Sequence, residues 1–120
     1  MTFTDNEWAV MEALWAGKAL ELGEIARALP QQLGWSRTTL HTYLTRLAKK
    51  GAVTIDRAAA PHRYRAAVSR EECAAAQRRG LLERAYHGSA GALISAFVRD
   101  GSLTAAERAE LRRLLDEMEV

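Results

Sequence analysis

The sequence has few of the residues that build covalent, metal-bound or membrane-embedded structures. Its 120 residues include one cysteine, so an internal disulfide and a cysteine-rich zinc site are both excluded. No apolar run approaches the ~18 residues that a membrane helix needs. The N-terminus lacks the basic start and apolar centre of a secretory signal. With 48% hydrophobic residues the chain is also too apolar for disorder. We therefore expect a soluble, cytoplasmic protein without a cofactor.

The net charge of +2 suggests no particular partner, but the charges are unevenly distributed. Residues 36–70 hold eight arginines and lysines against one aspartate, whereas residues 1–35 and 71–120 are each net acidic. A basic segment of this kind indicates an anionic partner, with nucleic acid as the first candidate. The basic residues could form a binding surface or only an ordinary solvated face. The structural elements that carry them decide between these two possibilities.

Two helices are predicted before the basic segment. Thr4 and Glu7 form a capping box, in which each side chain satisfies a backbone donor of the first helical turn. Apolar residues then recur at helical spacing as far as Gly17. A shorter helix is predicted over residues 23–29, and Pro30 ends it.

The basic segment itself predicts a third helix followed by a β-hairpin. Ser36 is a suitable N-cap, and the helix is expected to end near Lys50, with Gly51 just beyond its C-terminus. Residues 53–56 and 64–68 then alternate between apolar and polar, which is typical of two strands joined by an irregular basic loop. The order helix, helix, turn, helix, hairpin is that of a winged helix-turn-helix, so the predicted fold is mainly α with a small β-hairpin wing.

In a winged helix the helix after the turn enters the DNA major groove, and the wing lies beside the backbone. Here that helix and wing carry hydroxyl, imidazole and cationic groups, which can contact phosphates and base edges. The predicted partner is therefore double-stranded DNA. The predicted DNA-binding residues are Ser36, Arg37, Thr38, Thr39, His41, Thr42, Thr45, Arg46, Lys49, Arg57, His62, Arg63 and Arg65.

We expect the chain to divide into a DNA-binding domain, residues 1–69, and a helical dimerisation domain, residues 70–120. Three predicted helices in the second segment are too little material to form a stable core alone, so self-association is expected. A two-fold dimer also suits a palindromic operator. The residues predicted to form the dimer contact are Leu81, Leu82, Tyr86, Leu93, Ile94, Phe97, Val98, Leu111, Leu114, Leu115 and Met118.

Several segments together resemble the penicillinase repressor family (BlaI/MecI/CopY-like). They are Leu22-Gly-Glu-Ile-Ala-Arg-Ala-Leu29, Trp35-Ser-Arg-Thr-Thr-Leu-His-Thr-Tyr-Leu-Thr-Arg-Leu-Ala-Lys-Lys-Gly51, Leu93-Ile-Ser-Ala-Phe97 and Glu110-Leu-Arg-Arg-Leu114. The resemblance implies a homodimeric repressor of dyad operators, often for antibiotic resistance genes.

In some members of that family a membrane sensor protease inactivates the repressor by cutting before a phenylalanine. The aligned bond is Ala96–Phe97, with alanine in place of the asparagine of those members. Copper-responsive members carry paired Cys-x-Cys motifs, so the single cysteine, Cys73, argues against copper sensing of that kind.

The sequence offers less support for other functions. The three histidines are scattered over different predicted elements, and no metal-ligand spacing or nucleophile motif accompanies them, so we expect neither an enzyme nor a metal site. A winged-helix regulator controlled by a small-molecule effector remains an alternative. A winged helix that serves only as a protein-interaction module is a further alternative, although the basic segment argues against it.

Overall fold

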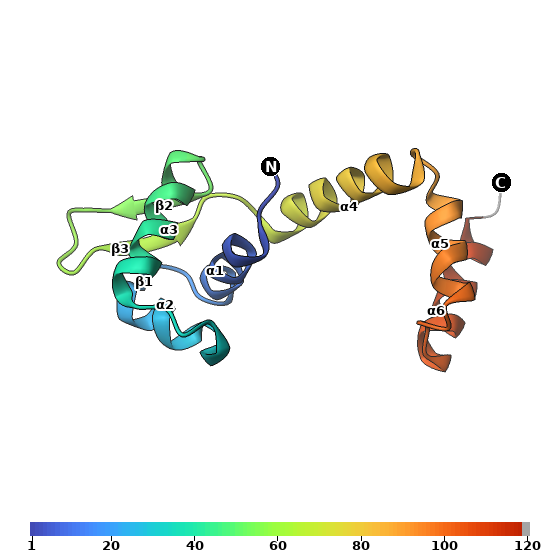
Figure 1. The fold of residues 1–120 in the computed structure, drawn as a ribbon, viewed down its shortest axis with the longest axis horizontal. Helices are drawn as coiled ribbons and strands as arrows, with labels where there is room; N and C mark the ends of the chain where they lie inside the picture. The colour runs from blue at the N-terminus through green and yellow to red at the C-terminus, as the bar shows by residue number, and fades with distance from the viewer. Residues whose placement is uncertain (119–120) are drawn as a thin grey trace. The chain divides into compact units, whose positions relative to one another are not determined.

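The computed structural model describes residues 1–118, which form six α-helices, one short 3-10 helix and three strands (Figure 1). In chain order these elements are α1 (Asp5–Ala16), β1 (Leu20–Glu21), α2 (Leu22–Ala28), η1 (Gln31–Leu33), α3 (Arg37–Lys49), β2 (Val53–Asp56), β3 (Arg63–Ala66), α4 (Arg70–Tyr86), α5 (Ala90–Arg99) and α6 (Ala105–Glu117). The predicted fold class, helices with a small β wing, is confirmed.

The chain forms two compact units, Met1–Gln77 and a second that begins at Arg78. The first unit includes the start of α4, where Cys73 is buried against the core of that unit. The predicted functional boundary between residues 69 and 70 coincides with the start of α4 at Arg70 and stays a prediction. Residues 119 and 120 of the predicted dimerisation domain lie outside the described residues.

Local sequence signals set the helix ends. At the start of α1 the Thr4 hydroxyl accepts a hydrogen bond from the Glu7 amide (3.2 Å), and the Glu7 carboxylate accepts one from the Thr4 amide (2.9 Å). Thr104 and Glu107 form the same capping box at the start of α6. The Ser36 hydroxyl accepts from the amide of Thr39 at the start of α3. These predicted caps are confirmed, and each satisfies amides that a helix leaves unpaired.

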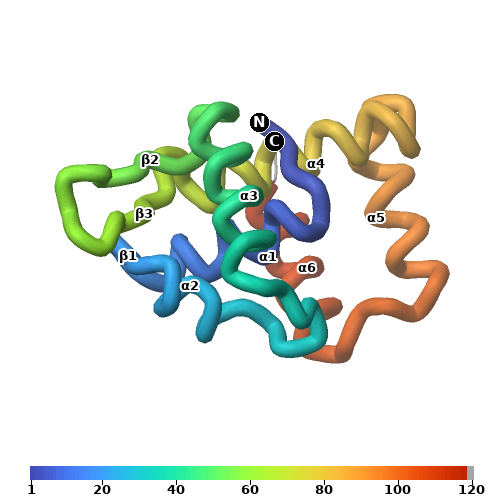
Figure 2. Tube along the Cα trace, turned by 60° about the vertical axis from the view of Figure 1, so that its left-hand side comes forward, coloured from blue at the N-terminus to red at the C-terminus, as the bar shows by residue number. Residues whose placement is uncertain are grey.

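The sheet has one strand more than predicted. The expected hairpin is present as β2 and β3, but β1 pairs with the other edge of β3, so the antiparallel order is β1-β3-β2. Tyr64 therefore lies between Leu20 and Ile55. Figures 1 and 2 both show the loop between β2 and β3 projecting away from the helices of the first unit.

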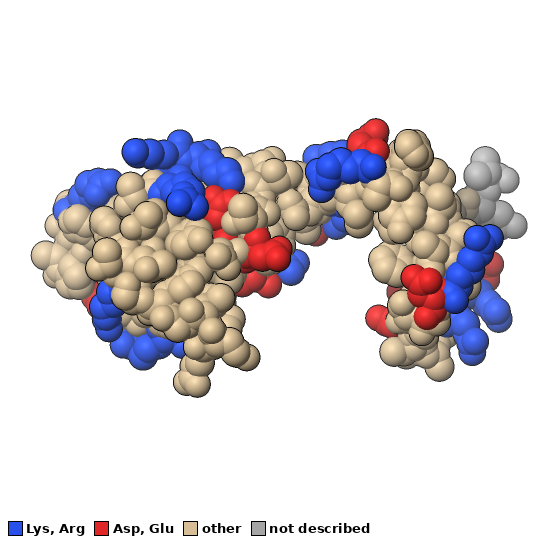
Figure 3. All heavy atoms as spheres, in the orientation of Figure 1, with Lys and Arg blue, Asp and Glu red and all other residues tan. Residues whose placement is uncertain are grey.

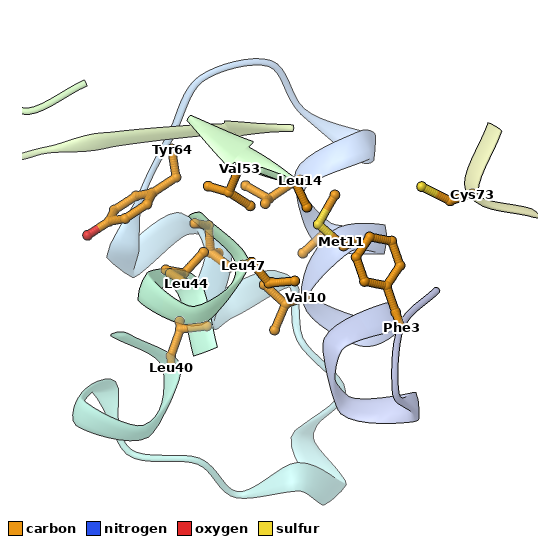
Figure 4. Packing of buried hydrophobic residues seen from close by; sticks show 13 residues of the cluster. Phe3, Val10, Met11, Leu14, Leu40, Leu44, Leu47, Val53, Tyr64 and Cys73 are labelled. Atoms are coloured by element: carbon orange, nitrogen blue, oxygen red, sulfur yellow. The ribbon is translucent and has the colours of Figure 1, made fainter. Parts of the chain in front are cut away.

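The core of the first unit holds α3 in place. Helix α3 contacts α1, α2 and β2, and its leucines Leu40, Leu44 and Leu47 are almost completely buried (Figure 4). They pack with Val10, Met11, Leu14, Ile25, Val53 and Tyr64, which come from the other elements of this unit. Because one side of α3 is fixed in the core, the direction of its opposite side is fixed as well.

The second unit is built differently. Its helices are separated where predicted, at Gly88 with φ of 81° and at Gly101 with φ of 69°. Ser89 caps α5 by accepting from the amide of Ala92 (3.1 Å). None of the described residues from Arg78 onward is buried, so a single copy of this unit has no interior of its own.

Candidate nucleic-acid interface

The side of α3 opposite its buried leucines faces solvent and carries most of the residues predicted to bind DNA. Since residues advance by ~100° around a helix, the buried and exposed sets occupy opposite faces. Thr39 and Thr45, at the edges of this face, are half-buried. The exposed residues are Arg37, Thr38, His41, Thr42, Arg46 and Lys49.

A shallow open hollow lies on the same face of α3. Its lining side chains are those of His41, Thr42, Thr45, Arg46 and Lys49. Hydroxyl, imidazole, guanidinium and ammonium groups therefore occur together on one convex helix. Such groups donate hydrogen bonds to phosphate oxygens and to acceptors on base edges. The structure thus brings these five predicted residues together.

Some hydroxyl groups of α3 already have partners within the helix. Thr42 donates to the carbonyl oxygen of Thr38 (3.0 Å), and the hydroxyls of Ser36 and Thr39 lie 3.1 Å apart. Because the Ser36 hydroxyl also caps α3, its first role is to define where the helix begins.

Aromatic side chains hold one arginine of this face in position. The guanidinium carbon of Arg46 lies 4.9 Å from the ring centre of Tyr43. Tyr43 is stacked on Trp35, with ring centres 4.5 Å apart and parallel planes, and its hydroxyl accepts a hydrogen bond from Asn6. The two aromatic rings belong to the support of α3, as their half-buried state indicates, and the Tyr43 ring reduces the freedom of Arg46.

Lys50 points away from the exposed face of α3 and binds α1 and the N-terminal segment. Its ammonium nitrogen lies 3.1 Å from Glu7 Oε1 and 2.9 Å from the carbonyl oxygen of Thr2. The Glu7 residue is only 3% exposed. Burial alone would raise the pKa of this carboxyl group, but hydrogen bonds from the Thr4 backbone and from Lys50 lower it below its ordinary value. Lys50 therefore anchors the end of α3, whereas its neighbour Lys49 faces solvent.

The hairpin residues fall into two groups. Arg57 and His62, in the loop between β2 and β3, and Arg65, on β3, are exposed. Arg63 is different because it donates to the carbonyl oxygen of Ala19 (3.1 Å) and lies 3.5 Å from the carboxylate of Glu21. Arg63 thus ties β3 to the segment around β1, a partner that the sequence prediction did not include.

Charges of opposite sign are separated on the surface of the first unit. On the face drawn in Figure 3, Lys and Arg side chains gather around the part that holds α3, α2 and the hairpin, whereas carboxylates gather over α1. Ion pairs join the two sets at their border, including Arg70 with Glu12 (2.8 Å). A polyanion would therefore meet attractive charge on the α3 and hairpin side.

The residues predicted to form the dimer contact lie on the helices of the second unit, and none is buried. Leu82, Tyr86, Leu93 and Leu111 are half-buried. The more exposed ones are Leu81, Ile94, Phe97, Val98, Leu114, Leu115 and Met118, with Phe97 at 47% and Met118 at 71%. The Ala96–Phe97 bond lies within α5.

Comparison with known proteins agrees with this geometry. The sequence profile described as "Penicillinase repressor" matches residues 3–117. The chain belongs to the penicillinase repressor family. The resemblance that the sequence motifs predicted is thereby confirmed.

Relatives of this family member include the penicillinase repressor of Bacillus licheniformis, which is 26% identical over 95% of this chain and 89% of its own length. The methicillin resistance regulatory protein MecI of Staphylococcus aureus is 28% identical over 92% of this chain and 90% of its own. A solved structure of Bordetella bronchiseptica BpsR aligns with 98% of this chain and 76% of its own, with 21% identity and a TM-score of 0.45, a likeness too distant to support an argument.

The described part of this penicillinase repressor family member was also compared with the requirements of a metal site and of a membrane helix. Within residues 1–118, no three histidine, cysteine or acidic side chains are grouped so that they could hold a metal ion. No helix in the same range is both long and apolar enough to cross a membrane. The assignment of individual residues to DNA contacts and to the dimer contact stays a prediction.

Proposed function

We propose that this protein is a transcriptional repressor that binds double-stranded DNA in a sequence-specific way, with α3 in the major groove and the hairpin beside it. The single observation that carries the proposal is the exposed face of α3, where His41, Thr42 and Thr45 lie beside Arg46 and Lys49. The threonines and His41 would meet base edges, and the cations would meet phosphates. Membership of the penicillinase repressor family supports the same function.

We also propose that the repressor is a homodimer joined through its second unit. None of the residues described from Arg78 to Met118 is buried, so this unit gains little from folding as a single copy, because burial of apolar surface is the main favourable term in folding. A second copy offers the same apolar residues and closes a two-fold contact. The dimer would then present two copies of α3 to a palindromic operator, with half-sites one helical turn or a multiple of it apart.

Proteolysis within α5 is the inactivation route that we propose, with the cut between Ala96 and Phe97. A protease binds its substrate as an extended chain, so this part of α5 must open before the bond is cut. Removal of the chain after Ala96 would take away Phe97, Val98 and all of α6, and the dimer would be lost. Mass spectrometry after incubation with a membrane sensor protease should find a fragment that ends at Ala96; a different cut site would refute this route.

DNA binding can be tested by fluorescence anisotropy with the DNA upstream of the protein's own coding region and with a random duplex. We expect the affinity for the upstream DNA to exceed that for random DNA and to fall as salt rises, because phosphate contacts release counterions. Thr42→Ala should reduce the difference between the two duplexes, since base contacts carry specificity. Lys49→Ala should weaken binding to both duplexes alike.

The outcome also decides between the proposal and its alternatives. No preference over random duplex, or an affinity that does not fall with salt, would refute sequence-specific repression and leave a protein-interaction role. Sedimentation of the full chain tests the dimer, and a monomer at micromolar concentration would refute it. Binding that appears or vanishes only with a small molecule would instead favour an effector-controlled regulator.

A further inference from the structure

Two arginines from different helices meet at Gly23, the second residue of α2. A Cβ atom at this glycine would lie 3.1 Å from Nη1 and 3.4 Å from Nη2 of Arg37, the first residue of α3. It would also lie 3.6 Å from Nη1 of Arg27, which is in the last turn of α2. Helices α2 and α3 contact one another (Figures 1 and 2), so both guanidinium groups lie over the same stretch of α2 backbone.

Neither arginine has a carboxylate partner in the part of the chain that the structure describes. Both side chains are exposed. The two carboxylates nearest in sequence have other partners. Glu24 accepts from the amide of Glu21 (2.8 Å), and Glu21 lies beside Arg63. Two like charges that converge without a counter-ion repel one another, and a shared anion between them removes that repulsion.

We propose that Arg27 and Arg37 together bind one phosphate group of the DNA backbone and that Gly23 leaves the space in which they converge. The proposal rests on the DNA-binding function proposed above and adds Arg27 to the interface. In a helix-turn-helix the helix before the groove-binding helix crosses the DNA backbone, and α2 occupies that position. Guanidinium groups suit this role because their planar donors match phosphate oxygens.

This pair also changes the expected role of Arg37. On sequence grounds Arg37 could contact a base or a flanking phosphate. With its guanidinium group against α2, it contacts the backbone, and base contacts belong to residues further along α3. Phosphate contacts fix the register of a protein on the duplex without carrying sequence information. Loss of either arginine should therefore weaken binding to any duplex.

The first test removes the charges one at a time and together. We expect Arg27→Ala and Arg37→Ala each to weaken binding roughly tenfold to upstream and random duplex alike. The double variant should lose less binding affinity than the product of the two single losses. Its slope of log affinity against log salt should become shallower by about 0.9, which corresponds to one phosphate. Arg112→Ala, an exposed arginine of α6 in the second unit, is the matched control and should bind like the wild type.

The second test keeps every charge and fills the space at Gly23. Alanine favours helices more than glycine does, so Gly23→Ala should leave the thermal midpoint unchanged or raise it. Its methyl group would lie 3.1 Å from Nη1 of Arg37, so the guanidinium group must shift by a few tenths of an ångström. DNA binding should therefore weaken, by less than the loss in Arg37→Ala. In an Arg37→Ala background the same substitution should have no further effect. A merely structural role for Gly23 would not produce this dependence on Arg37.

The results separate the failure of this inference from the failure of the proposed function. If the wild type binds DNA with salt dependence and Arg27→Ala binds equally well, the phosphate site is refuted while the repressor function stands. A double variant whose slope changes by about two phosphates, with losses that multiply, refutes a shared phosphate. If the wild type binds no duplex, the proposed function fails, and the inference fails with it.

Discussion

Two neighbouring lysines at the end of α3 should respond to mutation in opposite ways. The Lys50 ammonium group lies between the Glu7 carboxylate at 3.1 Å and the carbonyl oxygen of Thr2 at 2.9 Å, and 4.9 Å from the ring centre of Phe3. Lys49 is exposed and has no carboxylate partner in residues 1–118. Lys50→Met and Lys49→Met each remove one charge while keeping an apolar stem of similar length, so they form a matched pair.

The magnitude for Lys50 follows from what its removal leaves behind. Glu7 keeps its hydrogen bond from the Thr4 amide but loses its ion pair with Lys50, while the Glu7 residue is 3% exposed. A hydrogen bond to a charged group contributes about 1.5–3 kcal/mol, and solvent screening reduces this because Lys50 itself is 36% exposed. We therefore expect Lys50→Met to destabilise the first unit by about 1–2 kcal/mol, which lowers the thermal midpoint by about 5–10 °C.

Two measurements distinguish the lysines. Thermal unfolding followed by circular dichroism should show the lower midpoint for Lys50→Met and little change for Lys49→Met. The salt dependence of DNA binding should show the reverse, with the slope shallower by about 0.9 for Lys49→Met and unchanged for Lys50→Met. A Lys50 variant with normal stability and a shallower salt slope would refute our assignment of Lys50 to the support of α3.

The side chains of Glu7, Cys73 and Phe97 each allow a direct test. The pKa of Glu7 is lowered in the folded protein, so the ionised carboxylate stabilises the fold above the ordinary pKa of 4.5, and this stabilisation is lost as the pH falls through the folded value. The free energy of unfolding in urea should therefore depend less on pH in this acidic range for Glu7→Gln than for the wild type. The same pH dependence in both proteins would contradict the lowered pKa. Burial raises the pKa of the Cys73 thiol, so Ellman's reagent at neutral pH should react slowly until urea unfolds the protein; fast reaction in the native state would show an accessible thiolate. Phe97→Glu should convert a dimer to a monomer in sedimentation experiments, because a carboxylate replaces apolar surface that a partner would cover; an unchanged dimer would exclude this part of α5 from the contact.

The helix ends could be predicted because their causes are local. A capping box needs only two residues three positions apart, and those of α1 and α6 occur where expected. Strand β1 could not be predicted, since a two-residue strand has no periodicity and depends on pairing with Tyr64 and Arg63 of β3. The start of α2 was displaced by one residue for a related reason. Glu21, which is not a favoured cap residue, caps this helix with Glu24.

The candidate site shows the same division between local and distant causes. Helical periodicity alone predicts which residues of α3 face away from its buried leucines. The residues found together on that face, as expected, are His41, Thr42, Thr45, Arg46 and Lys49. Periodicity cannot predict that Arg63 binds Ala19 and Glu21, or that Lys50 binds Glu7, because these partners come from distant parts of the chain. Periodicity does not predict the proposed pairing of Arg27 with Arg37 either, since only the packing of α2 on α3 brings the two arginines together.

Glutamates of the acidic N-terminal segment pair with some cations of the basic segment and leave the others free to contact an anion. Three of its glutamates each hold one cation of the basic segment 36–70, in the pairs Glu7 with Lys50, Glu12 with Arg70 and Glu21 with Arg63. Within the described residues, the basic residues of that segment without a carboxylate partner are Arg37, Arg46, Lys49, Arg57 and Arg65. These lie on α3 or on the hairpin. Positive charge is thus neutralised where it supports the fold and left unpaired where DNA would approach, so the small net charge of the whole chain is compatible with a strongly attractive binding surface.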